Sequence, residues 1–167
     1  MSAGKPAVKG FTLIELMVVI VIVAVFAGLA APSMRELIAA SKLRGASSEF
    51  YASLLAARSE AVKRRANAVI EPIGATWSTG WTVKTGGTVL LTVDPLPSEV
   101  TVQVNVTADA TTPITYAMNG RISSTNPVDI IFYNASMPIQ ARCVGMNPSG
   151  LPRMRQDTNR VGTDGCN

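Results

Sequence analysis

The stretch KGFTLIELMVVIVIVAVFAGLAAPSM, residues 9–34, decides how this chain folds. Residues 11–31 would form a helix of about 31 Å, close to the roughly 30 Å hydrocarbon core of a bilayer. Lys5 and Lys9 precede the apolar run, which favours a cytoplasmic N-terminus and an exported remainder. The stretch therefore predicts one membrane-spanning helix, which starts close to the beginning of the chain.

One acid, Glu15, interrupts this run near its cytoplasmic end. A carboxylate inside a membrane span costs a few kcal/mol, and a plain membrane anchor leaves that cost unexplained. A secretory signal peptide cut near Gly28 and Ala30 is a second reading, but Pro32 would follow the cut almost at once. Neither alternative gives Glu15 a purpose.

Composition limits the chemistry that the chain can perform. With 167 residues, the chain can hold one ordinary domain plus an anchor. It has no histidine, which removes histidine triads and the commonest zinc sites, and its net charge of +4 is spread too thinly to imply nucleic-acid binding. We expect no enzyme, no metal and no cofactor.

Beyond the span, the pattern predicts a bend at Pro32 and then an amphipathic helix to about residue 66. Its expected buried face comprises Leu37, Leu43, Phe50, Leu54, Ala57 and Ala61. The basic run at residues 63–65 can be read as a phosphate-binding patch, but cations also favour a helix C-terminus. We prefer the second reading.

After Asn67 the chain changes to short β-branched runs separated by turn residues, which predicts antiparallel strands. In the segment VTVQVNV, four valines alternate with polar residues, so that one strand face should pack on the amphipathic helix. Gly86-Gly87 and Asn119-Gly120 are turn signals. Trp77 and Trp81 can line a groove, but packing between strands is the simpler interpretation.

The segment KGFTLIEL, residues 9–16, resembles the processing site of type IV prepilins. The resemblance implies a leader of residues 1–10, cleavage by prepilin peptidase between Gly10 and Phe11, and methylation of the new N-terminus. It also implies that Glu15 pairs with the terminal amine on Phe11 of a neighbouring subunit during assembly. An ion pair in lipid offsets a desolvation cost that neither group tolerates alone, which would account for the acid.

A second segment, FYASLLAARSEAVKRR at residues 50–65, narrows the resemblance to FimT/FimU minor pilins and GspH pseudopilins. The implied fold is α+β: a long N-terminal helix packed on a small antiparallel sheet domain. The implied division is the leader, a transmembrane helix at 11–34 and an exported pilin domain at 35–167.

The last 27 residues contain both cysteines, Cys143 and Cys166. In an exported domain a disulfide is the default, and this one would close about 24 residues and contribute roughly 3 kcal/mol. The bridge would also restrain the arginines between them.

Arg153, Arg155 and Arg160 are candidate DNA-binding residues. Some FimT-like proteins bind DNA, and the resemblance implies that a glycine-arginine-x-arginine motif contributes. This chain has GLPRMR instead, so the arginine pair is displaced. Three phosphate contacts would give a salt slope of only about −2.7. A competing structural reading places Arg153 and Arg155 on a strand whose intervening Met154 faces the core.

We expect a minor pilin that helps to initiate and assemble a type IV pilus. The expected location is the bacterial inner membrane, with a single pass, the C-terminal domain in the periplasm, and incorporation into a pilus or pseudopilus. Expected partners are major and minor pilins, the assembly platform and prepilin peptidase. The alternatives are a type II secretion pseudopilin and a DNA-binding pilus subunit for natural transformation.

Overall fold

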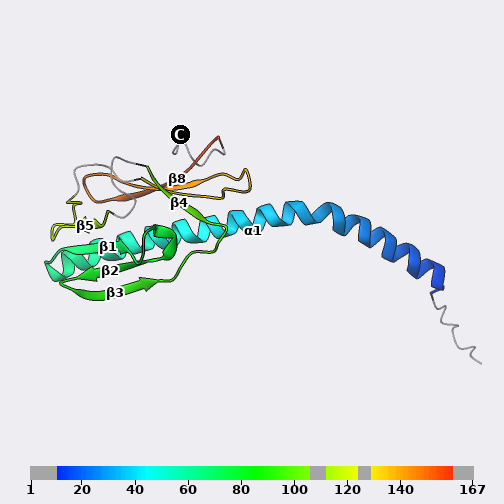
Figure 1. Ribbon diagram of the computed structural model, residues 1–167, viewed down its shortest axis with the longest axis horizontal. Coiled ribbons are helices and arrows are strands. Elements are labelled where there is room, and N and C mark those ends of the chain that lie inside the picture. The colour runs from blue at the N-terminus through cyan, green and yellow to red at the C-terminus, as the bar shows by residue number, and fades with distance from the viewer. Residues whose placement is uncertain (1–10, 106–111, 124–128, 160–167) are drawn as a thin grey trace, which may run out of the picture. The chain divides into compact units, whose positions relative to one another are not determined.

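The computed structural model describes residues 11–105, 112–123 and 129–159 and divides into two compact units, Met1–Arg35 and Glu36–Asn167. Helix α1 (Leu13–Arg64) is followed by the short helix η1 (Trp77–Thr79) and, within the described residues, by eight strands (Figure 1). The strands are β1 (Ala68–Pro72), β2 (Trp81–Thr85), β3 (Thr88–Val93), β4 (Thr101–Asn105), β5 (Ile114–Tyr116), β6 (Asp129–Tyr133), β7 (Arg142–Met146) and β8 (Pro152–Gln156).

The strands form two antiparallel sheets. Sheet A has the order β3-β2-β1-β5, and sheet B has the order β4-β6-β7-β8. Side chains from both sheets join one buried cluster with the second half of α1, including Phe50 of the helix, Ile70 of sheet A and Phe132 of sheet B. The predicted class, a long helix packed on a small antiparallel domain, is confirmed, and its strands are divided between two sheets.

The helix face predicted to be buried is correct except at its start. Leu43, Phe50, Leu54, Ala57 and Ala61 are all 1% exposed or less. Leu37 is 60% exposed, and the prediction for it was wrong. Burial along the described part of α1 begins only at Ala39, so the apolar periodicity extends one turn beyond the part of the helix that the strands cover. Helix α1 includes Pro32, and a bend there stays a prediction.

Helix α1 ends within two residues of its predicted end. Arg65 has a φ of 50°, the left-handed conformation that stops a helix. The Ala66 N–H donates to the Ala61 carbonyl at 3.2 Å, and the Arg65 N–H donates to the Val62 carbonyl at 3.4 Å. This is a Schellman arrangement, which satisfies carbonyls that the helix itself leaves open.

The basic run at the helix end pairs within its own helix. Arg64 contacts the Glu60 carboxylate at 2.5 Å, and Lys63 lies 3.5 Å from the same group. The hydrogen bond from Arg64 is the main cause that lowers the pKa of Glu60. These contacts agree with the interpretation of the run as a helix-terminus feature.

Two predicted turns lie where glycine is needed. Gly86 and Gly87 join β2 to β3 with φ values of 57° and 83°, which favour residues without a Cβ. Gly120 has a φ of 74°, and its N–H donates to the Ala117 carbonyl at 2.8 Å. The Asn119-Gly120 signal therefore forms a tight turn after β5.

The alternating valines pack as predicted where the structure describes them. Val100 is buried, and Val102 and Val104 of β4 pack against the main cluster. Val106 lies outside the described residues. Strand β4 pairs with β6, whose Ile130 and Phe132 point to the same cluster.

The two tryptophans are packing residues and do not line a groove. The Phe50 ring of α1 meets Trp77 and Trp81 edge to face, with centroid distances of 5.4 and 5.1 Å. The Trp81 Nε1–H donates to the Ser53 hydroxyl at 3.0 Å, and that hydroxyl donates to the Glu49 carbonyl at 2.9 Å. The prediction of packing is confirmed, and the packing includes Phe50 of the helix as well as residues of the strands.

Candidate functional site

The N-terminal half of α1 is apolar, and it is not buried among the residues that the structure describes. Leu13–Ala30 has a mean hydropathy of 2.9 and is long and apolar enough to cross a membrane, and none of it is buried inside the chain. Contact between this apolar surface and water is unfavourable. The surface is therefore suited to lipid or to packing against other apolar helices.

Thr12 and Glu15 together cap the start of this helix. The Glu15 N–H donates to the Thr12 hydroxyl at 3.2 Å, and the Thr12 N–H donates to the Glu15 carboxylate over a longer 3.5 Å. The pattern Thr-x-x-Glu before an apolar run is a capping box, which satisfies two N–H groups that a helix start leaves open. The acidic side chain also lies at the positive end of the helix dipole.

The Thr12–Glu15 capping box could have been predicted from the sequence, but it was not. The sequence reasoning gave Glu15 only an intermolecular role, whereas the structure shows that its carboxylate also has an intrachain partner. Phe11, the predicted first residue after cleavage, is 86% exposed. Gly10 lies outside the described residues.

Two of the three candidate DNA-binding arginines lie on β8, at the edge of sheet B. Arg153 and Arg155 are exposed, and Arg160 lies outside the described residues. Met154 pairs with the buried Val144 and so lies on the core side of the sheet, but it is 36% exposed. The strand was predicted correctly. The expected burial of Met154 is incomplete, because β8 is an edge strand.

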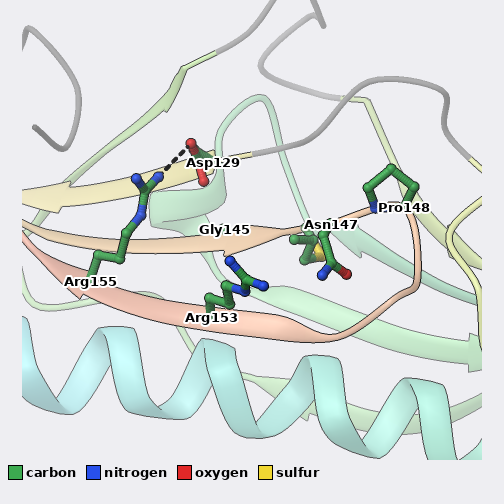
Figure 2. A pocket seen from close by; sticks show the side chains of 7 residues that line it. Asp129, Gly145, Asn147, Pro148, Arg153 and Arg155 are labelled. Carbon is green, nitrogen blue, oxygen red and sulfur yellow. Dashed lines mark hydrogen bonds and ion pairs between the residues drawn. The ribbon is translucent and has the colours of Figure 1, made fainter.

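A pocket of about 250 Å³ opens beside these arginines, between the ends of three strands. It is lined by Asp129, Gly145, Asn147, Pro148, Arg153 and Arg155, among others. We call it the Arg153 pocket. Figure 2 shows the Arg155 and Asp129 side chains pointing toward one another over β7, and the guanidinium group of Arg153 close to Gly145.

The register of sheet B builds this pocket. Asp129 of β6 is the partner of Gly145 on β7, which in turn is the partner of Arg153 on β8. The residues next to Gly145, Val144 and Met146, belong to the main core. Since side chains alternate along a strand, the pocket lies on the face of sheet B that is turned away from α1.

Arg155 has an ion-pair partner, whereas Arg153 has none in the described part of the chain. The Arg155 Nη2 atom donates to the Asp129 Oδ2 atom at 2.9 Å, diagonally across β7. Among the residues that the structure describes, no carboxylate pairs with Arg153. The sequence singled out both arginines but not Asp129, since no local pattern joins residues 26 positions apart.

The absence of a side chain at Gly145 leaves room for the Asp129 carboxylate. A Cβ atom at this position would lie 2.0 Å from the Asp129 Oδ1 atom and 3.8 Å from the Arg155 Nη2 atom. A side chain at this position would therefore require the Asp129 carboxylate to move away from its place beside Arg155.

Cys143 of β7 is fully buried, in a small second cluster with Ile131 and Ala141. Its predicted partner, Cys166, lies outside the described residues, so their disulfide stays a prediction. In the described part of the chain, no group of three or more acidic, cysteine or histidine side chains is placed to hold a metal ion.

An apolar helix with a capped start, followed by a domain in which the second half of the same helix packs on antiparallel sheets, defines the pilin-like class of proteins. The family model described as "Type II transport protein GspH" matches residues 46–150, more than half of the chain. The chain belongs to this family. A second model, "Prokaryotic N-terminal methylation motif", matches residues 5–31.

Solved structures show the same fold. Two crystal structures of the type IV minor pilin FimU from Pseudomonas aeruginosa, in different space groups, are similar to this chain. The first has 20% identity and a TM-score of 0.60 and covers 76% of this chain and 96% of its own. The second has 19% identity and a TM-score of 0.55 and covers 74% of this chain and 99% of its own. No curated protein matches the sequence.

Proposed function

We propose that this protein is a minor subunit of a type IV pilus and takes part in starting and assembling the filament. The observation that carries the proposal is a methylation-motif helix whose apolar surface is wholly unburied within its own chain, joined to a FimU-like domain. Such a helix gains most by packing against other helices of its kind in or above a membrane. The function is assembly and not catalysis.

Processing and docking follow from the same segment. Prepilin peptidase cuts between Gly10 and Phe11, and the new N-terminus is methylated. The protein is then held in the bacterial inner membrane by a single pass over residues 11–34, with residues 35–167 in the periplasm. Its partners are major and minor pilins and the assembly platform.

Glu15 docks the subunit by pairing with the terminal amine on Phe11 of a neighbour. The capping contacts with Thr12 place the Glu15 carboxylate at the start of the helix, on the same side as the chain's own N-terminal end. In lipid, the attraction between a carboxylate and a protonated amine offsets a desolvation cost that neither group tolerates alone, so Glu15 favours the assembled state.

Two measurements test this proposal. Mass spectrometry of the protein from its own cells should find a chain that begins with methylated Phe11. Filament preparations should contain the wild type and lack Glu15→Val, while Glu36→Gln, an exposed acid on the same helix, should be incorporated normally. A mature protein that retains Met1, or one that is cut near Ala30, would rule the proposal out.

A pseudopilin of the type II secretion system is the second candidate, and the family match favours it. The two functions use the same processing and the same helix packing, so the fold does not separate them. Deletion of the gene decides: loss of pili supports the first candidate, and loss of protein secretion with intact pili supports the second.

A disulfide between Cys143 and Cys166 is proposed to stabilise the exported domain. The burial of Cys143 in its own small cluster supports a structural role for its sulfur. The mass of the peptide pair with and without a reducing agent tests the bridge.

DNA binding by Arg153, Arg155 and Arg160 is the remaining role to test. The exposure of Arg153 supports it, whereas the pairing of Arg155 with Asp129 opposes it, because a phosphate would have to compete with that carboxylate. Equal retardation of duplex DNA by the wild type and by the double variant Arg153→Ala/Arg155→Ala would exclude this site.

A further inference from the structure

The Arg153 pocket has a charge balance that suits one small anion. It contains two guanidinium groups and one carboxylate, and the Arg155–Asp129 pair at 2.9 Å neutralises one of the cations. Arg153 is left as the unpaired charge among the described residues. The pocket therefore presents a net charge of about one positive unit at its mouth.

The guanidinium group of Arg153 suits a planar partner. Guanidinium groups bind carboxylates through two parallel N–H···O bonds, a geometry that a planar carboxylate matches and that lysine does not provide. The exposed Pro148 gives the rim of the pocket an apolar surface. About 250 Å³ is room for the end of one side chain.

We propose that the Arg153 pocket receives an aspartate or glutamate carboxylate from a neighbouring protein subunit, which forms an ion pair with Arg153 beside the Arg155–Asp129 pair. The inference rests on the proposed function, because it requires a filament in which subunits lie against one another. It adds a side-by-side contact between exported domains to the contacts of the N-terminal helices.

The charges favour a protein carboxylate over a nucleic acid. A duplex carries a dense row of phosphates, which would bring several negative charges close to the Asp129 carboxylate. A single carboxylate can approach Arg153 on its open side and leave the Arg155–Asp129 pair intact.

The test uses the full chain in its own cells, with a photo-crosslinking amino acid in place of Pro148. We expect crosslinks to a segment of another pilin-like subunit that contains an aspartate or glutamate. Arg153→Glu should lower the crosslink yield at least tenfold, and Arg121→Glu, an exposed arginine that does not line the pocket, should leave the yield unchanged. Replacing the partner's acid by arginine in the Arg153→Glu background should restore the crosslink.

Two controls show that a lost crosslink reports a lost contact. Arg153→Glu should be present in cells at the level of the wild type, and the purified variant should have the near-ultraviolet circular dichroism spectrum of the wild type. An unchanged crosslink in Arg153→Glu, crosslinks to DNA, or the absence of any crosslink from wild-type filaments would each overturn the inference alone. Absence of the wild type from filaments would overturn the proposed function as well, and this is measured separately by immunoblotting of sheared filaments.

Discussion

The two halves of α1 both carry large apolar side chains but differ in how these side chains are buried. In the first half, Ile20 is 59% exposed and Phe26 is 66% exposed within the chain. In the second half, Phe50 and Leu54 are both fully buried against the sheets. The first half leaves its apolar side chains exposed among the described residues, whereas the second half buries its apolar side chains in the core of the domain. One helix therefore serves two separate purposes.

This contrast predicts that mutations in the two halves have effects of different size on domain stability. The purified full-length chain in detergent micelles is the sample, and urea unfolding is followed by the near-ultraviolet circular dichroism of Trp77 and Trp81. Both tryptophans belong to the unit Glu36–Asn167, so the signal reports on that unit.

The largest effect is expected for Leu54→Ala. Leu54 is fully buried in the main cluster, and deleting its side chain should lower the free energy of unfolding by about 2–5 kcal/mol. The matched control is Leu55→Ala, since Leu55 is the next residue of α1 and is 39% exposed. That control should change the stability by about 0.5 kcal/mol or less. Similar losses for both variants would contradict the assigned core face.

A smaller effect is expected for Ser53→Ala. The Ser53 hydroxyl accepts the Trp81 Nε1–H at 3.0 Å in a buried site, so its removal leaves a buried indole donor without a partner. The cost should be about 1–3 kcal/mol in the same urea titration. Ser48→Ala, at an exposed position on the same helix, is the control and should be close to neutral. A neutral Ser53→Ala would mean that water replaces the hydroxyl.

Alkaline pH should lower the free energy of unfolding of the unit Glu36–Asn167, because Tyr116 is buried in it. Burial raises the pKa of Tyr116 to about 12 from the ordinary value of 10.0, because desolvation disfavours the phenolate. The neutral phenol therefore contributes stability that is fully present below pH 10 and is lost as the pH rises toward 12. The loss should be at most about 1.4 kcal/mol per pH unit.

Tyr116→Phe has no proton to lose and serves as the reference for other groups that titrate above pH 10. The stability difference between the wild type and this variant should be constant from pH 7 to 9 and should shift against the wild type above pH 10. Parallel stability curves through pH 12 would show that Tyr116 does not contribute.

The smallest effect is expected in the first half of α1. Ile20→Ala should change the free energy of unfolding of the unit Glu36–Asn167 by about 0.5 kcal/mol or less, because Ile20 belongs to the other unit, Met1–Arg35, and is 59% exposed. A loss above 1 kcal/mol would break the comparison, since it would mean that the two halves share one cooperative unit.

Patterns that depend on neighbours in the chain were predicted well. The apolar span, the buried face from Leu43 to Ala61 and the glycine turns follow from local periodicity and backbone conformation. The predicted burial of Leu37 was wrong, because periodicity does not show where the sheets stop covering a helix. The Arg155–Asp129 ion pair was not predicted for a related reason. Its two residues meet only through the register of three strands.

The sequence by itself determined the membrane-length helix, the methylation motif, the acid at position 15 and the amphipathic continuation of the helix, because each depends on residues within a few positions of one another. Only the tertiary structure decided that the strands form two sheets, that the tryptophans pack against Phe50, and that Asp129 pairs with Arg155 in a pocket which Arg153 also lines. Strand register sets which distant side chains come into contact, and that register is fixed by the packing of the whole domain.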